Sequence, residues 1–200
     1  MTLAYPDNLP ELAKSLLWPL NLFYSYYQRE MPEITPIFDL HLPAPYKELL
    51  AHEHNMTPTL EHYYDSTIHI ERLNVVPEQD ETSREVILRL DNNENPVEYG
   101  ACRVFLNGLP ARAKELISAG QVPLGTILHQ CKCHHTVELS GFFKVKPTSF
   151  FKNIFPSANG SPLYGRRNTL VALDGTPIAE VCEVLPPAED KQSQEKRYEQ

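Results

Sequence analysis

Ser83-Arg-Glu-Val-Ile-Leu-Arg-Leu90, followed by Asp91-Asn-Asn-Glu-Asn95 and the stretch 96–106, is the part of the sequence that decides the fold. Aliphatic residues fill the first part and turn-forming residues the second, which predicts two antiparallel strands joined by a hairpin. Similar apolar patterns predict strands at 67–76, 136–145, 165–173 and 177–185, and helices are expected at 9–30 with a break at Pro19, 46–54, 57–64, from 110, and 124–130. Strands and helices in separate blocks are typical of an α+β domain.

Composition narrows the class of protein. Two hundred residues with 42% hydrophobic and 22% charged side chains fit one globular domain. The formal charge of −8 and the absence of a Lys/Arg-rich run argue against a nucleic-acid partner. The longest apolar stretch, 16–24, is too short and too broken for a membrane span, and residues 1–10 do not read as a signal peptide. Four cysteines without such a signal predict reduced thiols and a cytoplasmic location.

The 18 prolines cluster near the two ends of the chain. This distribution predicts a Pro-rich N-terminal extension with short helices at 1–45, a main domain at 46–187, and a disordered charged tail at 188–200. A monomer or a small homo-oligomer is expected.

Two charged residues fall on strand faces that are otherwise apolar. Arg84 shares its face with Val86, Leu88 and Leu90, and Glu183 shares its face with aliphatic residues of 177–185. From the pattern alone, the more ordinary interpretation is that both charges lie at strand ends and reach solvent, or pair with each other. The alternative is a small anionic ligand between them, because a buried guanidinium needs an anion. Periodicity does not decide between the two.

Several sequence blocks resemble the chorismate pyruvate-lyase family and occur in the family's order. They are Asn55-Met-Thr-Pro-Thr-Leu-Glu61, Ser83-Arg-Glu-Val-Ile-Leu88, Val122-Pro-Leu-Gly125, Leu163-Tyr-Gly-Arg-Arg167 and Cys182-Glu-Val-Leu-Pro186. The likeness covers about 46–187. Tyr99-Gly100 and Gly141-Phe-Phe-Lys-Val145 make the branch with the mycobacterial and cyanobacterial lyases the most similar one.

The resemblance implies a six-stranded antiparallel sheet with helices packed on it, enclosing a buried ligand site. It implies conversion of chorismate to 4-hydroxybenzoate and pyruvate, without metal or organic cofactor, for a quinone or another aromatic pathway. The family's carboxylate-binding arginine falls on Arg84, its acidic residue on Glu183, and its two backbone contacts on Met56 and Leu124. Arginine holds a carboxylate bidentately, and backbone N–H groups near helix starts add neutral donors. Whether Glu183 acts as acid, base or anchor stays open.

Arg166 and Arg167 resemble the paired arginines of the family and are further candidates for a substrate carboxylate. Strand alternation turns one of them inward. An inter-strand ion pair with an acidic neighbour explains them equally well.

Other motifs favour structural roles. Cys131-Lys-Cys133-His134-His135 lacks the second ligand pair that structural zinc sites use, so no metal is expected. Phe142, Phe143, Phe150, Phe151 and Phe155 are expected to form core and lid material, and His52, His54, His62 and His69 to be solvated. Two alternatives to the lyase remain: an enzyme acting on a different aromatic or enolpyruvyl acid, and a non-catalytic ligand-binding module, because effector domains of bacterial regulators share this fold.

Overall fold

The computed structural model describes residues 9–158 and 160–188. Their strands form a single antiparallel sheet in the order β1-β5-β6-β7-β4-β3-β2. The bounds are β1 Ile34–Ile37, β2 Ile68–Pro77, β3 Glu81–Leu90, β4 Pro96–Phe105, β5 His135–Val145, β6 Leu163–Ala172 and β7 Pro177–Leu185. The predicted α+β class is confirmed. The predicted count of six strands is wrong, because Ile34–Ile37 in the Pro-rich segment adds a seventh strand along β5.

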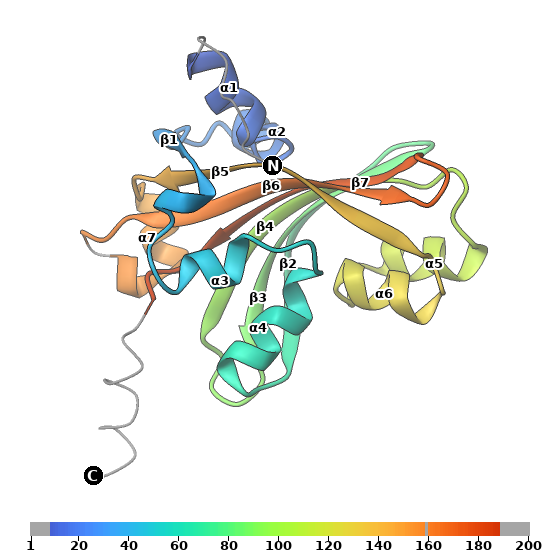
Figure 1. Cartoon of the computed structure of the whole chain (residues 1–200). Coiled ribbons are helices and arrows are strands. Elements are labelled where there is room, and N and C mark those ends of the chain that lie inside the picture. Colours follow the sequence, from blue (N-terminus) through green and yellow to red (C-terminus); the bar gives the residue numbers. More distant parts are fainter. Residues whose placement is uncertain (1–8, 159, 189–200) are drawn as a thin grey trace.

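Helices cover both faces of the sheet (Figure 1). Helices α1 (Leu9–Leu16) and α2 (Leu20–Tyr26) lie on one side, where α7 (Ser149–Ile154) also packs. Helices α3 (Tyr46–Leu50), α4 (Met56–Tyr64), α5 (Ala111–Ala119) and α6 (Leu124–Gln130) lie on the other side. Two 3-10 turns, Asp39–His41 and Pro156–Ala158, complete the elements. No helix in 9–158 or 160–188 is long and apolar enough to cross a membrane.

The central hairpin forms where the sequence predicts it. Strands β3 and β4 pair from Glu81 opposite Phe105 to Leu88 opposite Glu98, with Arg84 opposite Cys102. The break in the helical segment at Pro19 is also confirmed, because α1 ends before it and α2 begins after it. Helix α4 begins at Met56 with Asn55 as its N-cap, one residue before the predicted bound at 57.

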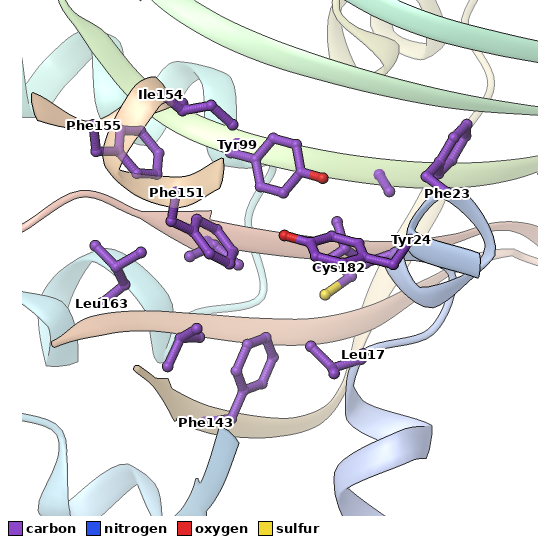
Figure 2. Close-up of a cluster of buried hydrophobic side chains, with 14 of the residues drawn as sticks. Leu17, Phe23, Tyr24, Tyr99, Phe143, Phe151, Ile154, Phe155, Leu163 and Cys182 are labelled. Atoms are coloured by element: carbon purple, nitrogen blue, oxygen red, sulfur yellow. The ribbon is translucent and has the colours of Figure 1, made fainter. Parts of the chain in front are cut away.

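The first face of the sheet carries a large aromatic core, shown in Figure 2. Tyr99, Phe143 and Cys182 from the strands meet Tyr24 from α2 and Phe151 from α7. This face lies opposite Arg84, so Phe143, Phe150, Phe151 and Phe155 are core residues there, and the expectation that they cover the ligand site is wrong. Phe142 faces the other side.

A buried carboxylate ties α2 to this face. Glu85 is fully buried and accepts hydrogen bonds from Arg29, from the Tyr99 hydroxyl and from Asn74 Nδ2 (2.6 Å). The Arg29 guanidinium lies over the Phe150 ring, 4.2 Å from its centroid. Strand β3 is therefore buried on both faces, although the alternation in its sequence suggests a more polar side at Glu85.

The second face carries two smaller cores. Helices α3 and α4 pack on one end of the sheet and helices α5 and α6 on the other. The candidate site lies between these two cores. The predicted tail falls mostly on 189–200, outside the described residues.

Candidate functional site

A cavity of about 70 Å³ lies between the sheet and the first residues of α4 and α6. One water molecule needs roughly 10–15 Å³ of such space, so the cavity admits something larger. Its walls combine aliphatic side chains with a few converging polar groups, as in small-molecule sites. The residues that carry its chemistry are Met56, Arg84, Glu98, Leu124, Arg166, Asn168 and Glu183.

Arg84 lies on β3 with 2% of its surface exposed. Its Nε donates to the sulfur of Cys102, the residue opposite it on β4, at 3.3 Å, and its Nη1 donates to the Val122 carbonyl at 3.3 Å. No carboxylate of residues 9–158 or 160–188 forms an ion pair with it. A guanidinium cannot lose its proton, so Arg84 is a buried cation with weak neutral partners. An anion in the cavity would neutralise it.

Two backbone groups lie at the same cavity. Met56 is the first residue of α4 and Leu124 the first residue of α6, and both line the cavity. Backbone N–H groups in a first helical turn have no acceptor within the helix. Both are thus neutral donors for an anion that Arg84 would hold.

Glu183 lies on β7 and is paired with Arg166, not with Arg84. Arg166 Nε donates to Glu183 Oε2 at 2.6 Å, and Asn168 Nδ2 donates to the same oxygen at 3.0 Å. Glu183 and Arg84 are separated by β4, where Gly100 lies directly opposite Glu183. Ideal strand spacing places their Cα atoms roughly 12 Å apart. Gly100 has no side chain, and the Glu98 carboxyl group lies above it, since an added Cβ would be 2.8 Å from Glu98 Oε1.

Arg166 holds the segment before α4 in place. Its Nη1 donates to the carbonyls of Leu50 (3.2 Å) and His52 (2.9 Å), and its Nη2 donates to the carbonyl of His54 (3.2 Å). Burial, and secondarily the charge of Arg166, lower the pKa of His52. His52 Nε2 donates to the Leu49 carbonyl at 2.8 Å, which leaves Nδ1 to face Arg166 as an acceptor. Each of the three guanidinium nitrogens thus has an acceptor within the protein, and Arg166 links β6 and β7 to the segment before α4.

Glu98 is a second carboxyl group in the cavity, on β4. It is 5% exposed, and its Oε2 has no hydrogen-bond partner among the described residues. Burial, and then the nearby charge of Glu183, raise the pKa of Glu98 well above its usual value, and Arg166 only partly opposes this. Glu98 is therefore a buried carboxyl group whose protonated form is favoured, and it lies near the Glu183 carboxylate that Arg166 pairs.

The structure brings together five of the six site residues expected from the sequence. Met56, Arg84, Leu124, Arg166 and Glu183 all line the cavity. Arg167 does not, because it points to the opposite face of β6 and pairs with Glu180 at 3.0 Å. The direct Arg84–Glu183 pair is not formed.

Two residues of the site were missed by the sequence interpretation. Glu98 shares its strand face with Gly100, Cys102 and Val104, so the alternation that singled out Arg84 would also have found it. Asn168 lies two residues after Arg166 on the same face. His54 is exposed, as expected, and it also lines the cavity, whereas His52 is half-buried.

The Cys131–His135 stretch lies elsewhere. His135 hydrogen-bonds the Cys133 carbonyl and the Asn55 side chain, at 2.8 and 3.1 Å. Throughout 9–158 and 160–188, no three His, Cys, Asp or Glu side chains gather so as to hold a metal ion.

Comparison with known proteins gives a fold likeness only. No family model and no curated protein sequence matches the chain. The crystal structure of PhnF from Mycobacterium smegmatis aligns over 67% of this chain and 64% of that one, with 8% identity and a TM-score of 0.50. The effector domain of the same protein aligns over 66% of this chain and 88% of its own length, with 8% identity and a TM-score of 0.51. The chain thus spans less than two thirds of full-length PhnF and has the fold of its effector domain.

Proposed function

We propose that this protein binds a small aromatic carboxylic acid in the cavity and that it is a chorismate lyase, releasing 4-hydroxybenzoate and pyruvate. The observation that carries the proposal is Arg84, a fully buried guanidinium that faces the cavity without an acidic partner among the described residues. A buried charge of this kind costs several kcal/mol in order of magnitude, which a bound carboxylate would offset. The choice of chorismate rests on the sequence blocks that resemble the lyase family.

In this proposal the ligand carboxylate lies against Arg84 and the backbone N–H groups of Met56 and Leu124. The ring extends from Arg84 through the cavity toward Glu183. During the reaction the ether C–O bond breaks, the neighbouring ring carbon loses a proton, and the ring becomes aromatic. The released enolpyruvate takes up a proton to give pyruvate, so atoms balance without an oxidant. The residues position the substrate and exclude water, and aromatisation provides much of the driving force.

The test is incubation of the purified full chain with chorismate, with 4-hydroxybenzoate and pyruvate measured separately. We expect equimolar release of both products by the wild type. Arg84→Met is expected to abolish turnover, whereas the matched control Arg167→Met, on the other face of the sheet, is expected to retain it. Absence of product from a folded wild-type protein would refute the lyase assignment.

A second candidate is a binding module without catalysis. The specific observation in its favour is the fold shared with the effector domain of PhnF, which aligns over 88% of that domain. Tight binding of 4-hydroxybenzoate without turnover of chorismate would select this candidate. Failure to bind any aromatic acid would refute both.

A further inference from the structure

The thiol of Cys102 lies in the wall of the cavity beside Arg84. The two residues are directly opposite each other on β4 and β3, and Arg84 Nε donates to Cys102 Sγ at 3.3 Å. Within 9–158 and 160–188, no carboxylate forms an ion pair with Arg84. A negative charge placed on the Cys102 side chain would therefore pair directly with this guanidinium.

The other three cysteines have different surroundings. Cys182 is buried on the opposite face of the sheet, where it donates to the Leu16 carbonyl at 3.5 Å, and burial raises the pKa of its thiol. Cys131 and Cys133 follow α6 and do not line the cavity, and burial raises the pKa of Cys133. Cysteines react as thiolates, which form most readily beside a cation such as arginine. Of the four, Cys102 combines a direct contact with an arginine and a position in the cavity.

The cavity lies next to the molecular surface near the start of α4. His54, Asn55 and Val137 line both the cavity and a surface groove of about 480 Å³. The cavity of about 70 Å³ has room for several water molecules at roughly 10–15 Å³ each. Hydrogen peroxide is little larger than water, so this small neutral oxidant fits into the cavity beside Cys102.

We propose that Cys102 is a modification site at which hydrogen peroxide switches off ligand binding at Arg84. The sulfur attacks one peroxide oxygen, the O–O bond breaks, and the leaving hydroxide takes the thiol proton to form water. The thiol is thereby oxidised to a sulfenic acid and the peroxide is reduced, and a second peroxide converts the sulfenic acid to a sulfinic acid. The sulfinic acid loses its proton, and its anion pairs with Arg84 in place of the ligand carboxylate. This inference rests on the proposed function, since it takes the ligand carboxylate to lie at Arg84.

The test treats the full chain with hydrogen peroxide in the presence and absence of 4-hydroxybenzoate. Peptide mass mapping is expected to find added oxygen atoms at Cys102 in the ligand-free protein. Saturating 4-hydroxybenzoate is expected to slow oxidation of Cys102 about tenfold or more, because only the empty protein reacts, and to leave oxidation of Cys131 unchanged. Calorimetry after the treatment is expected to show affinity for 4-hydroxybenzoate reduced roughly thirtyfold or more. Cys102→Ser is expected to lose this response to peroxide, whereas the matched control Cys131→Ser, outside the cavity, is expected to keep it.

A substitution tests the effect of the charge without an oxidant. Cys102→Asp places a carboxylate beside Arg84, so we expect it to weaken binding of 4-hydroxybenzoate roughly thirtyfold or more and to raise the urea midpoint of the ligand-free protein. Cys102→Asn has a similar shape and no charge, and it is expected to weaken binding much less and to leave the midpoint below that of Cys102→Asp.

The outcomes separate the two proposals. A wild type that binds neither benzoate nor 4-hydroxybenzoate before oxidation overturns the proposed function. In that case a higher urea midpoint on oxidation of Cys102 supports the sulfinate pair with Arg84, and an unchanged midpoint overturns the pair as well. A wild type that binds the acid, but in which Cys102 stays reduced, is not protected by the acid, or is oxidised without loss of affinity, overturns this inference alone. The peroxide experiments on the wild type decide the case in which Cys102→Asp does not fold.

Discussion

Replacing Arg84 by methionine tests the central claim about the site. Met has a similar length and no charge, so the change removes a buried cation without leaving a large void. Among the described residues, Arg84 donates to the Cys102 sulfur and to one carbonyl, both at 3.3 Å, and these two bonds return about 2 kcal/mol. The effective cost of burying the charge is several kcal/mol. We therefore expect the free energy of unfolding of the ligand-free protein to rise by about 1–2 kcal/mol.

Arg166→Met is the matched control, because Arg166 is equally buried but fully partnered. Its removal leaves the Glu183 carboxylate without its cation and three carbonyls without a donor. Breaking such a pair costs about 3–5 kcal/mol. Urea denaturation at pH 7 measures the change in the free energy of unfolding for both variants, which is calculated from the midpoint and the slope of each curve.

Ligand linkage completes the test. At 100 times its Kd, 4-hydroxybenzoate should stabilise the wild type by about 2.7 kcal/mol and Arg84→Met by far less. Losing a buried charge partner weakens binding by about 2–5 kcal/mol, which is a factor of roughly 30 or more. Arg84→Met that unfolds as readily as Arg166→Met would show Arg84 to be structural. Undiminished binding of the acid by Arg84→Met would refute the placement of the carboxylate.

Three further predictions concern stability, each measured by urea denaturation. The raised pKa of Glu98 favours its protonated form in the folded state, so the wild type loses stability relative to Glu98→Gln as pH rises above about 4. The gap should grow up to the folded pKa of Glu98, and a gap that shrinks with pH would contradict the assignment. Arg29→Met leaves the buried Glu85 carboxylate without its cation and should cost about 3–5 kcal/mol, much of it recovered by adding Glu85→Gln. Gly165→Ala would place a Cβ 2.6 Å from the Phe143 ring and should cost about 3 kcal/mol, and an unchanged midpoint would be the contrary result.

The alternation of apolar and polar residues along single strands predicted much of the sheet and two charged residues of the site. It placed β7 at 177–185, as observed, and β3 and β4 within two residues of their observed bounds. It also placed Arg84 and Glu183 each on the apolar face of its own strand, because a period of two residues is a local property that the sequence displays directly. The same rule applied to 96–106 would have added Glu98.

Contacts between distant segments were beyond this kind of reasoning. Glu85 reads as a polar position on an exposed face, but Arg29, 56 residues away, brings its charge to it. Residues 9–26 read as part of an extension, yet Leu20, Phe23 and Tyr24 are buried in the aromatic core of Figure 2. The partner of a charge depends on tertiary packing, and neither propensity nor period encodes it.

The contacts of the segment before α4 with Arg166 could not be predicted from the sequence. Its contribution is made by the carbonyls of Leu50, His52 and His54, which every residue type supplies. The position of Arg166 opposite Glu183 on the sheet brings its guanidinium to these carbonyls. An arginine in a sequence predicts a cation, but only the tertiary structure shows which groups accept its hydrogen bonds.

The buried polar groups on the two faces of the sheet differ in how completely the protein itself supplies their hydrogen-bond partners. On the first face, Glu85 is buried with an arginine, a tyrosine and an amide, so the free-energy cost of burying its carboxylate is offset within the protein. On the second face, Arg84 is buried with two neutral acceptors, and Glu98 Oε2 and Asn168 Oδ1 are buried without a hydrogen-bond partner in the described part of the chain. Groups of this kind destabilise the empty protein and become favourable when a ligand completes them. Removing Arg29 on the first face should therefore weaken the fold, as should removing the paired Arg166 on the second, whereas removing Arg84 should strengthen the empty fold and weaken binding.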